Sequence, residues 1–143
     1  MVAVDTNILI YAHMRLMPLH DAAVAALTSL AETGADWCVP WSCVHEFCSV
    51  VTRQKLFNPP LTQLQALAAI ERLRSNANCR FLCEGPGYWA HFEHIVRASG
   101  VAGGAIHDAR VAAVCLEHEV DELWTHDRDF RKFPGLRVRN PLN

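Results

Sequence analysis

The first twelve residues of the chain place a carboxylate directly after a short apolar strand. Residues 2–4 form an apolar run of the kind buried in a parallel sheet, and the apolar residues 8–12 favour a helix. Between them lie Asp5, Thr6 and Asn7, which are residue types that begin helices. Ligands of open α/β sheets bind at the carboxyl ends of the strands. Asp5 is therefore expected at such an edge, although on this stretch alone it could equally be a simple helix cap.

The alternation of strand and helix continues along the chain. Further short apolar strands are predicted at residues 37–39, 80–83, 122–125 and 136–138. Helices are predicted at residues 19–33, 41–54, 61–75, 88–99 and 109–118, with Ser42 as an N-cap and Gly34 as a C-terminal stop. In the 61–75 helix, the core-facing residues are expected to be Leu64, Leu67, Ala68, Ile70 and Leu73. The order predicts a mainly parallel sheet with helices on both faces, folded as one domain over residues 1–143.

Composition favours a compact soluble protein in the cytoplasm. Hydrophobic residues make up 51% of the 143 residues, enough for one core, and charged residues make up 20%. No apolar run reaches the roughly 20 residues that cross a bilayer, so no membrane partner is expected. The opening apolar run is too short for a signal peptide, and Asp5 interrupts it.

Cysteines and histidines leave other metal sites open but do not favour them. The chain has six cysteines, most of them inside apolar patterns, which is typical of reduced and buried thiols. Zinc ligation by residues 38–48 would lack the usual close-spaced cysteine pairs. His91 and His94 share a helix face, yet no third ligand lies near them in the sequence.

Acidic residues recur at positions that such a fold brings together. Glu46 interrupts the apolar pattern of its helix, where an acid is costly unless it is paired or binds a cation. Asp108 lies near the start of a helix, and Asp127 and Asp129 follow a strand directly. Gathered at one end of the sheet with Asp5, these carboxylates would repel one another unless a divalent cation offset their charge. Ligands that are all oxygen favour magnesium or manganese over zinc.

These segments, in this order, resemble the PIN-domain family, and in particular the VapC toxins of bacterial toxin–antitoxin modules. The resemblance is carried by Asp5-Thr6-Asn7 after a strand, Ser42-x-x-x-Glu46 on a helix, Asp108-Ala109 at a helix start, and Thr125-x-Asp127-x-Asp129-Phe130 after a strand. It covers essentially the whole chain. The fold it implies is a three-layer α/β/α sandwich around a mainly parallel sheet.

The resemblance also implies a function and a site. The function would be a magnesium-dependent endoribonuclease, with manganese able to substitute, whose hydrolysis leaves a 5′-phosphate and a 3′-hydroxyl. The acidic quartet carries over to Asp5, Glu46, Asp108 and Asp127, with Asp129 as an accessory metal ligand and with Asp127 and Asp129 able to exchange roles. Supporting polar residues would be Thr6, Asn7, Ser42 and Thr125. The implied partners are RNA, a VapB-like antitoxin and a second copy of the chain in a homodimer.

Basic residues concentrate at the end of the chain. Residues 127–143 contain five basic and two acidic residues, a charge of +3, which leaves −5 for the rest of a chain whose net charge is −2. Such an end suits contact with phosphate, or it is simply a solvated tail. Candidate RNA-phosphate contacts are Arg110, Arg128, Arg131 and Lys132.

Three other functions fit part of the pattern. A haloacid-dehalogenase-like phosphatase would need a second acid two residues after Asp5, where this chain has Asn7. An HD-type phosphohydrolase would use His107 and Asp108, but that fold is all helix and leaves Asp5 without a role. A catalytically silent PIN module that only binds a partner would not need the intact set of acids.

Overall fold

The computed structural model describes all 143 residues and has a five-stranded, fully parallel sheet at its centre. The strand order is β3-β2-β1-β4-β5, so β1 lies in the middle. The strands are β1 (Val2–Val4), β2 (Trp37–Pro40), β3 (Cys79–Leu82), β4 (Glu122–Trp124) and β5 (Val138–Arg139). The predicted parallel α/β fold is confirmed, and an all-helical HD-type fold is excluded.

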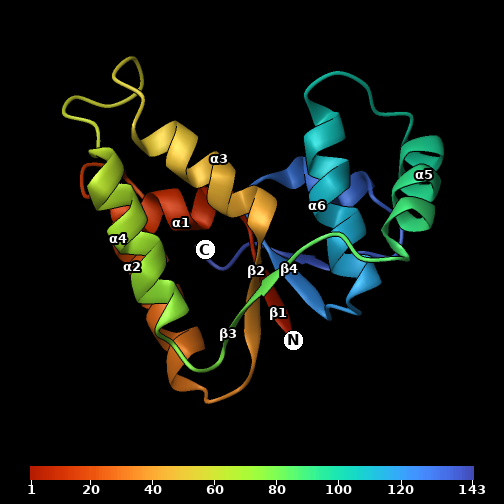
Figure 1. The fold of residues 1–143 in the computed structure, drawn as a ribbon, viewed down its shortest axis with the longest axis horizontal. Helices are drawn as coiled ribbons and strands as arrows, with labels where there is room; N and C mark the ends of the chain where they lie inside the picture. The colour runs from red at the N-terminus through yellow and green to blue at the C-terminus, as the bar shows by residue number, and fades with distance from the viewer.

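Helices cover both faces of this sheet. They are α1 (Thr6–His13), α2 (His20–Glu32), α3 (Trp41–Val51), α4 (Gln63–Arg74), α5 (Tyr88–Ser99) and α6 (Ala105–Glu117), with a short 3₁₀ helix η1 (Arg128–Lys132) after β4. Figure 1 shows α1 to α4 on one side of the strands and α5 with α6 on the other. This arrangement follows from the connections: the chain steps outward from β1 to β3 along one face and returns to β4 across the other.

One continuous core lies between the sheet and its two helical layers. It contains 32 buried hydrophobic residues, among which Trp37 and Phe47 are the largest that are fully buried. The middle strand β1 consists of valine and alanine, and all four residues of its neighbour β2 are buried, because both faces of the parallel sheet are covered. All six cysteines are free thiols, and four of them are buried, as the sequence indicates. No helix combines the length and the apolar character needed to span a bilayer.

Helix boundaries differ from the predictions where local capping chemistry intervenes. Gly34 adopts a left-handed φ of 69° after α2, as expected for a stop. Ser42 is not an N-cap: α3 already begins at Trp41, directly after Pro40. Thr62 instead begins α4 with a capping box that includes Gln65. The last helix of the second layer, α6, begins at Ala105 rather than at residue 109, so Asp108 lies within its first turn.

The predicted core face of α4 is only partly confirmed. Ile70 is buried and Leu73 packs partly against the core, as predicted. Leu64 is 72% exposed, Leu67 is 57% exposed and Ala68 is also exposed, whereas Ala66 and Ala69 are buried instead. The helix is rich in both leucine and alanine, so two faces carry apolar residues at helical spacing. Small alanine side chains let the helix approach its neighbours closely, and burying that face leaves both leucines in solvent.

Candidate functional site

Asp5 lies at the carboxyl end of the central strand and is buried, with 5% of its surface exposed. Its backbone N–H donates to the Trp124 carbonyl (3.0 Å), which joins the ends of β1 and β4. Asp5 occupies the N-cap position of α1, yet its side chain makes no capping hydrogen bond. Its Oδ2 instead accepts hydrogen bonds from Thr125 Oγ1 (2.7 Å) and Asn7 Nδ2 (2.6 Å). The side chain therefore belongs to a polar network at the edge of the sheet.

Thr125 is the centre of that network and is 1% exposed. Besides donating to Asp5, its hydroxyl accepts from Asn7 Nδ2 (2.9 Å) and from the Asp127 N–H (3.0 Å). Asp127 Oδ1 in turn accepts from the Asp129 N–H (2.8 Å), at the start of η1. The backbone that carries the last two acids is thus tied to Asp5 through one buried hydroxyl.

A cleft of about 510 Å³ opens between α3 and α6 beside this network. Glu46 and Asp108 line it from opposite sides, so the structure brings together these two predicted acids. Thr6 Oγ1 donates to Glu46 Oε2 (2.7 Å), which links the start of α1 to α3. The other residues of the cleft are Ser42, His45, Ser49, Gly104, His107, Arg110 and Val111.

Burial, and to a smaller extent repulsion among the acids, raises the pKa values of Asp5 and Asp108. Burial raises the pKa of Asp5 to about 6, the hydrogen bond from Thr125 opposes this rise, and the charges of Glu46 and Asp108 add to it. Burial also raises the pKa of Asp108, helped most by the charge of Asp127 and then by that of Glu46. The five acids therefore form one electrostatically coupled group. Within it, the charge of Asp127 raises the pKa of Asp108 more than that of Asp129 does.

The donor set fits a hard divalent cation. Carboxylate and hydroxyl oxygens suit magnesium and manganese, and a cation would relieve the repulsion that adds to the rise of both pKa values. No three acidic, histidine or cysteine side chains converge closely enough here to ligate a single ion. The residues that would hold it are the coupled acids, which come from different elements of the fold.

The four basic residues predicted to contact phosphate lie in different surroundings. Arg110 lines the cleft and forms an ion pair with Glu84. Arg128 and Arg131 line a second, smaller hollow of about 260 Å³ that also includes Thr125 and Asp127. Lys132 lies 5.5 Å from the centre of the Phe133 ring.

Sequence patterns indicated Cys43 and His45 only as disfavoured zinc ligands and gave Glu84 no functional role. Cys43 lies on the buried side of α3, where its Sγ is 3.7 Å from Asp5 Oδ1. No sequence pattern linked Cys43 to Asp5, because a cysteine within an apolar pattern is usually a small buried hydrophobe. His45 and His107 each precede a candidate acid by one residue, and both line the cleft.

Residues 2–136 match the sequence profile described as the PIN domain. The chain belongs to the PIN-domain family. Ribonuclease VapC48 of Mycobacterium tuberculosis is 31% identical to this PIN domain over 140 residues, which cover 97% of this chain and 96% of the relative. That identity over the full length places this PIN domain with the VapC ribonucleases, as the sequence motifs predict, and away from haloacid-dehalogenase-like enzymes.

Solved structures of VapC-type chains have the same fold. The PIN domain superposes on a chain of VapBC2 from Rickettsia felis, bound to a DNA fragment from its promoter, with a TM-score of 0.72, 17% identity and coverage of 97% of both chains. It superposes on Mycobacterium tuberculosis VapC20, described as a Sarcin-Ricin loop cleaving toxin, with a TM-score of 0.67, 17% identity and coverage of 96% of this chain and 99% of that one. At this identity these matches establish the shared fold.

Proposed function

We propose that this VapC-type ribonuclease is the toxin of a toxin–antitoxin pair and cleaves RNA internally with the help of magnesium. Asp5, Glu46, Asp108 and Asp127 would hold the metal, with Asp129 as an accessory ligand. The observation that carries the proposal is the buried carboxylate of Asp5, whose pKa is raised to about 6 in the company of other acids. Buried carboxylates with strongly raised pKa values occur mostly at functional sites.

The chain's own residues would divide the work at this site. Thr125 and Asn7 hold the Asp5 carboxylate in one orientation, and Thr6 holds that of Glu46. Ser42 lines the cleft beside Glu46 and bounds the space for substrate. A bound divalent ion supplies positive charge that stabilises the negative charge developing on the phosphate. Basic side chains around the acids then attract the RNA backbone.

Metal removal is the first test of this function. Purified protein should cleave RNA with magnesium or manganese and lose that activity in EDTA. Calcium should bind the acids yet support little cleavage, because its looser coordination positions reactants poorly. Readdition of magnesium after EDTA should restore the activity. Cleavage that continues undiminished in EDTA would point to a metal-free mechanism and overturn the proposal.

An antitoxin partner is supported by the shared fold with the VapBC2 chain. We propose that a segment of this partner reaches the acidic cleft and places an arginine among the acids, because the planar guanidinium matches carboxylates with two parallel hydrogen bonds. A separate apolar hollow of about 470 Å³, which includes Leu16, Met17 and Leu56, offers a second contact surface for such a partner, and Leu16 is 90% exposed. Leu19, which follows Leu16 and Met17 in the sequence, is partly buried against the core.

Competition with metal gives this partner a measurable signature. If antitoxin and magnesium occupy the same acids, each must weaken the binding of the other by the same factor. Titration of an antitoxin peptide against the protein should therefore give lower affinity with magnesium than in EDTA. Equal affinity under both conditions would mean that the inhibitor does not reach the acids.

A further inference from the structure

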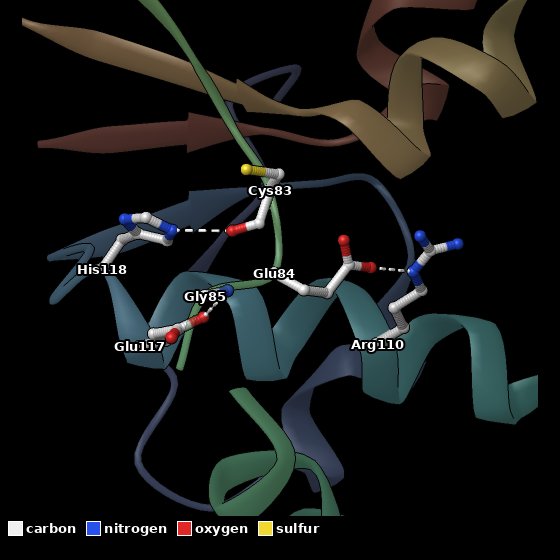
Figure 2. A network of polar contacts seen from close by, with 6 residues as sticks. All are labelled: Cys83, Glu84, Gly85, Arg110, Glu117 and His118. Carbon is white, nitrogen blue, oxygen red and sulfur yellow. Dashed lines mark hydrogen bonds and ion pairs between the residues drawn. The ribbon is translucent and has the colours of Figure 1, made fainter. Parts of the chain in front are cut away.

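The loop between β3 and α5 is fastened to α6 at three points (Figure 2). The carboxylate of Glu117 accepts hydrogen bonds from the N–H groups of Gly85 (2.9 Å) and Gly87 (2.8 Å). His118 Nε2 donates to the Cys83 carbonyl (2.8 Å). The third point is the ion pair of Glu84 with Arg110. Hydrogen bonds to the backbone of Cys83 and Gly85 thus hold the backbone of Glu84 in place on both sides.

This fastening is specific to the residues present. A Cβ atom on Gly85 would lie 2.7 Å from Glu117 Oε1, so only glycine lets the carboxylate approach the backbone as it does. Glu117 also comes from the last turn of α6, while Arg110 comes from its middle. The same rigid helix therefore holds the loop and carries the arginine that Glu84 binds.

The ion pair leaves Arg110 with free donors at the cleft. Its Nε bonds Glu84 Oε1, whereas its two terminal nitrogens have no hydrogen-bond partner within the protein. Figure 2 shows these two nitrogens pointing away from Glu84. Arg110 lines the cleft that Glu46 and Asp108 also line, and its side chain is 40% exposed. A phosphate in the cleft would meet a guanidinium whose direction is already fixed.

We propose that Glu84 is a positioning residue for RNA, which holds Arg110 so that its terminal nitrogens bind an RNA phosphate next to the one that is cleaved. This inference rests on the proposed ribonuclease function of the cleft. A free arginine loses side-chain entropy when it binds, and an arginine held at Nε loses less. The acids repel the RNA backbone, so a fixed cation in the same cleft offsets part of that repulsion.

Charge alone predicts the opposite role for Glu84. The carboxylate partly neutralises Arg110 and adds a negative charge near the cleft, so Glu84→Gln would strengthen RNA binding if only net charge mattered. Positioning predicts that the same change weakens binding, because glutamine holds Nε less firmly. The sign of the effect therefore separates the two explanations.

The test uses a short fluorescein-labelled RNA of randomised sequence, with binding followed by anisotropy in calcium and cleavage in magnesium. Glu84→Gln should weaken binding about three- to tenfold and raise KM by a similar factor, with kcat nearly unchanged, because a flanking phosphate contact is uniform binding. Arg110→Gln should weaken binding about tenfold or more, and Arg110→Lys should restore only part of it. Adding Glu84→Gln to Arg110→Gln should weaken binding no further.

Glu93→Gln is the control, since Glu93 also forms an ion pair with an arginine, Arg97 on α5, but does not line the cleft. It should leave KM and binding unchanged. Tighter binding by Glu84→Gln, or equal losses from Glu84→Gln with and without Arg110, would overturn the inference. If instead cleavage survives EDTA, the ribonuclease site itself is misassigned, and the two failures are thereby distinguished.

Discussion

Asp5→Asn is expected to lower RNA cleavage about a thousandfold or more while the protein stays folded. The change removes the charge of the one acid in the group that is buried, with almost no change in side-chain volume. Asparagine keeps an oxygen that can accept the hydrogen bonds of Thr125 and Asn7, so the edge of the sheet should remain intact. The measurement is the initial rate of RNA cleavage in magnesium, with circular dichroism to confirm folding.

The same variant should be more stable than wild type when metal is absent. The pKa of Asp5 is about 6 in the folded protein against 3.8 unperturbed, so ionising Asp5 at neutral pH costs roughly 3 kcal/mol of folding free energy at most. Because the folded protein favours protonated Asp5, the contribution of Asp5 to the stability of the wild type is greatest below about pH 4, where Asp5 is protonated in both states. That contribution is lost as the pH rises through about 6. In EDTA, the melting temperature of the variant should therefore rise relative to that of the wild type between pH 4 and pH 7.

A carboxylate at the opposite end of the strands provides the control for Asp5. Asp36 precedes β2 and pairs with Arg80, far along the strands from the acidic group. Asp36→Asn should leave cleavage within about twofold of wild type, because exposed ion pairs contribute little. Full activity in Asp5→Asn, or an equal loss in both variants, would contradict the assignment of Asp5.

Thr125→Val is expected to lower cleavage by about ten- to a hundredfold although it removes no charge. Valine matches threonine in shape, yet it loses the donor to Asp5 and the acceptor for the Asp127 N–H and Asn7. Groups that orient metal ligands typically have effects of this size. Buried polar groups left without partners should also cost about 1–3 kcal/mol of stability. Cleavage rates and urea denaturation measure the two effects.

Thr125→Ser separates the hydroxyl from the packing of the side chain. Serine keeps the oxygen and loses only a methyl group, so it should recover most of the activity while paying a small packing cost in stability. If Thr125→Val cleaves as fast as wild type, or if serine is as defective as valine, then the hydroxyl does not orient Asp5.

The parallel fold and the grouping of the acids are predictable from the sequence because the strands that precede Asp5 and Asp127 are visible as local patterns. Asp5 comes after a buried strand and Asp127 after another, and parallel strands end at the same edge of the sheet. The regular α/β alternation thereby predicts that distant carboxylates meet. The coupled pKa values of Asp5 and Asp108 agree with that expectation.

Other features depend on contacts that the sequence does not reveal. Leu64 and Ala66 sit on different faces of α4, and only the shape of the neighbouring helix determines which face is buried. Glu84 lies 26 residues from its partner Arg110, in a turn whose composition indicates only a loop. The hydroxyl of Thr125 is recognisable as a supporting group by resemblance, but its bond to Asp5 spans 120 residues.

Metal-induced stabilisation of the wild type and of Asp5→Asn tests the central claim most directly, because it requires neither the natural RNA nor the antitoxin. Thermal melts with increasing manganese or magnesium should raise the melting temperature of the wild type step by step, since a ligand that binds only the folded state stabilises it. The Asp5→Asn protein should show little or no rise over the same concentrations, and Asp36→Asn should follow the wild type. An equal rise in wild type and Asp5→Asn would show that the metal binds elsewhere and would contradict the assignment of the acidic cleft.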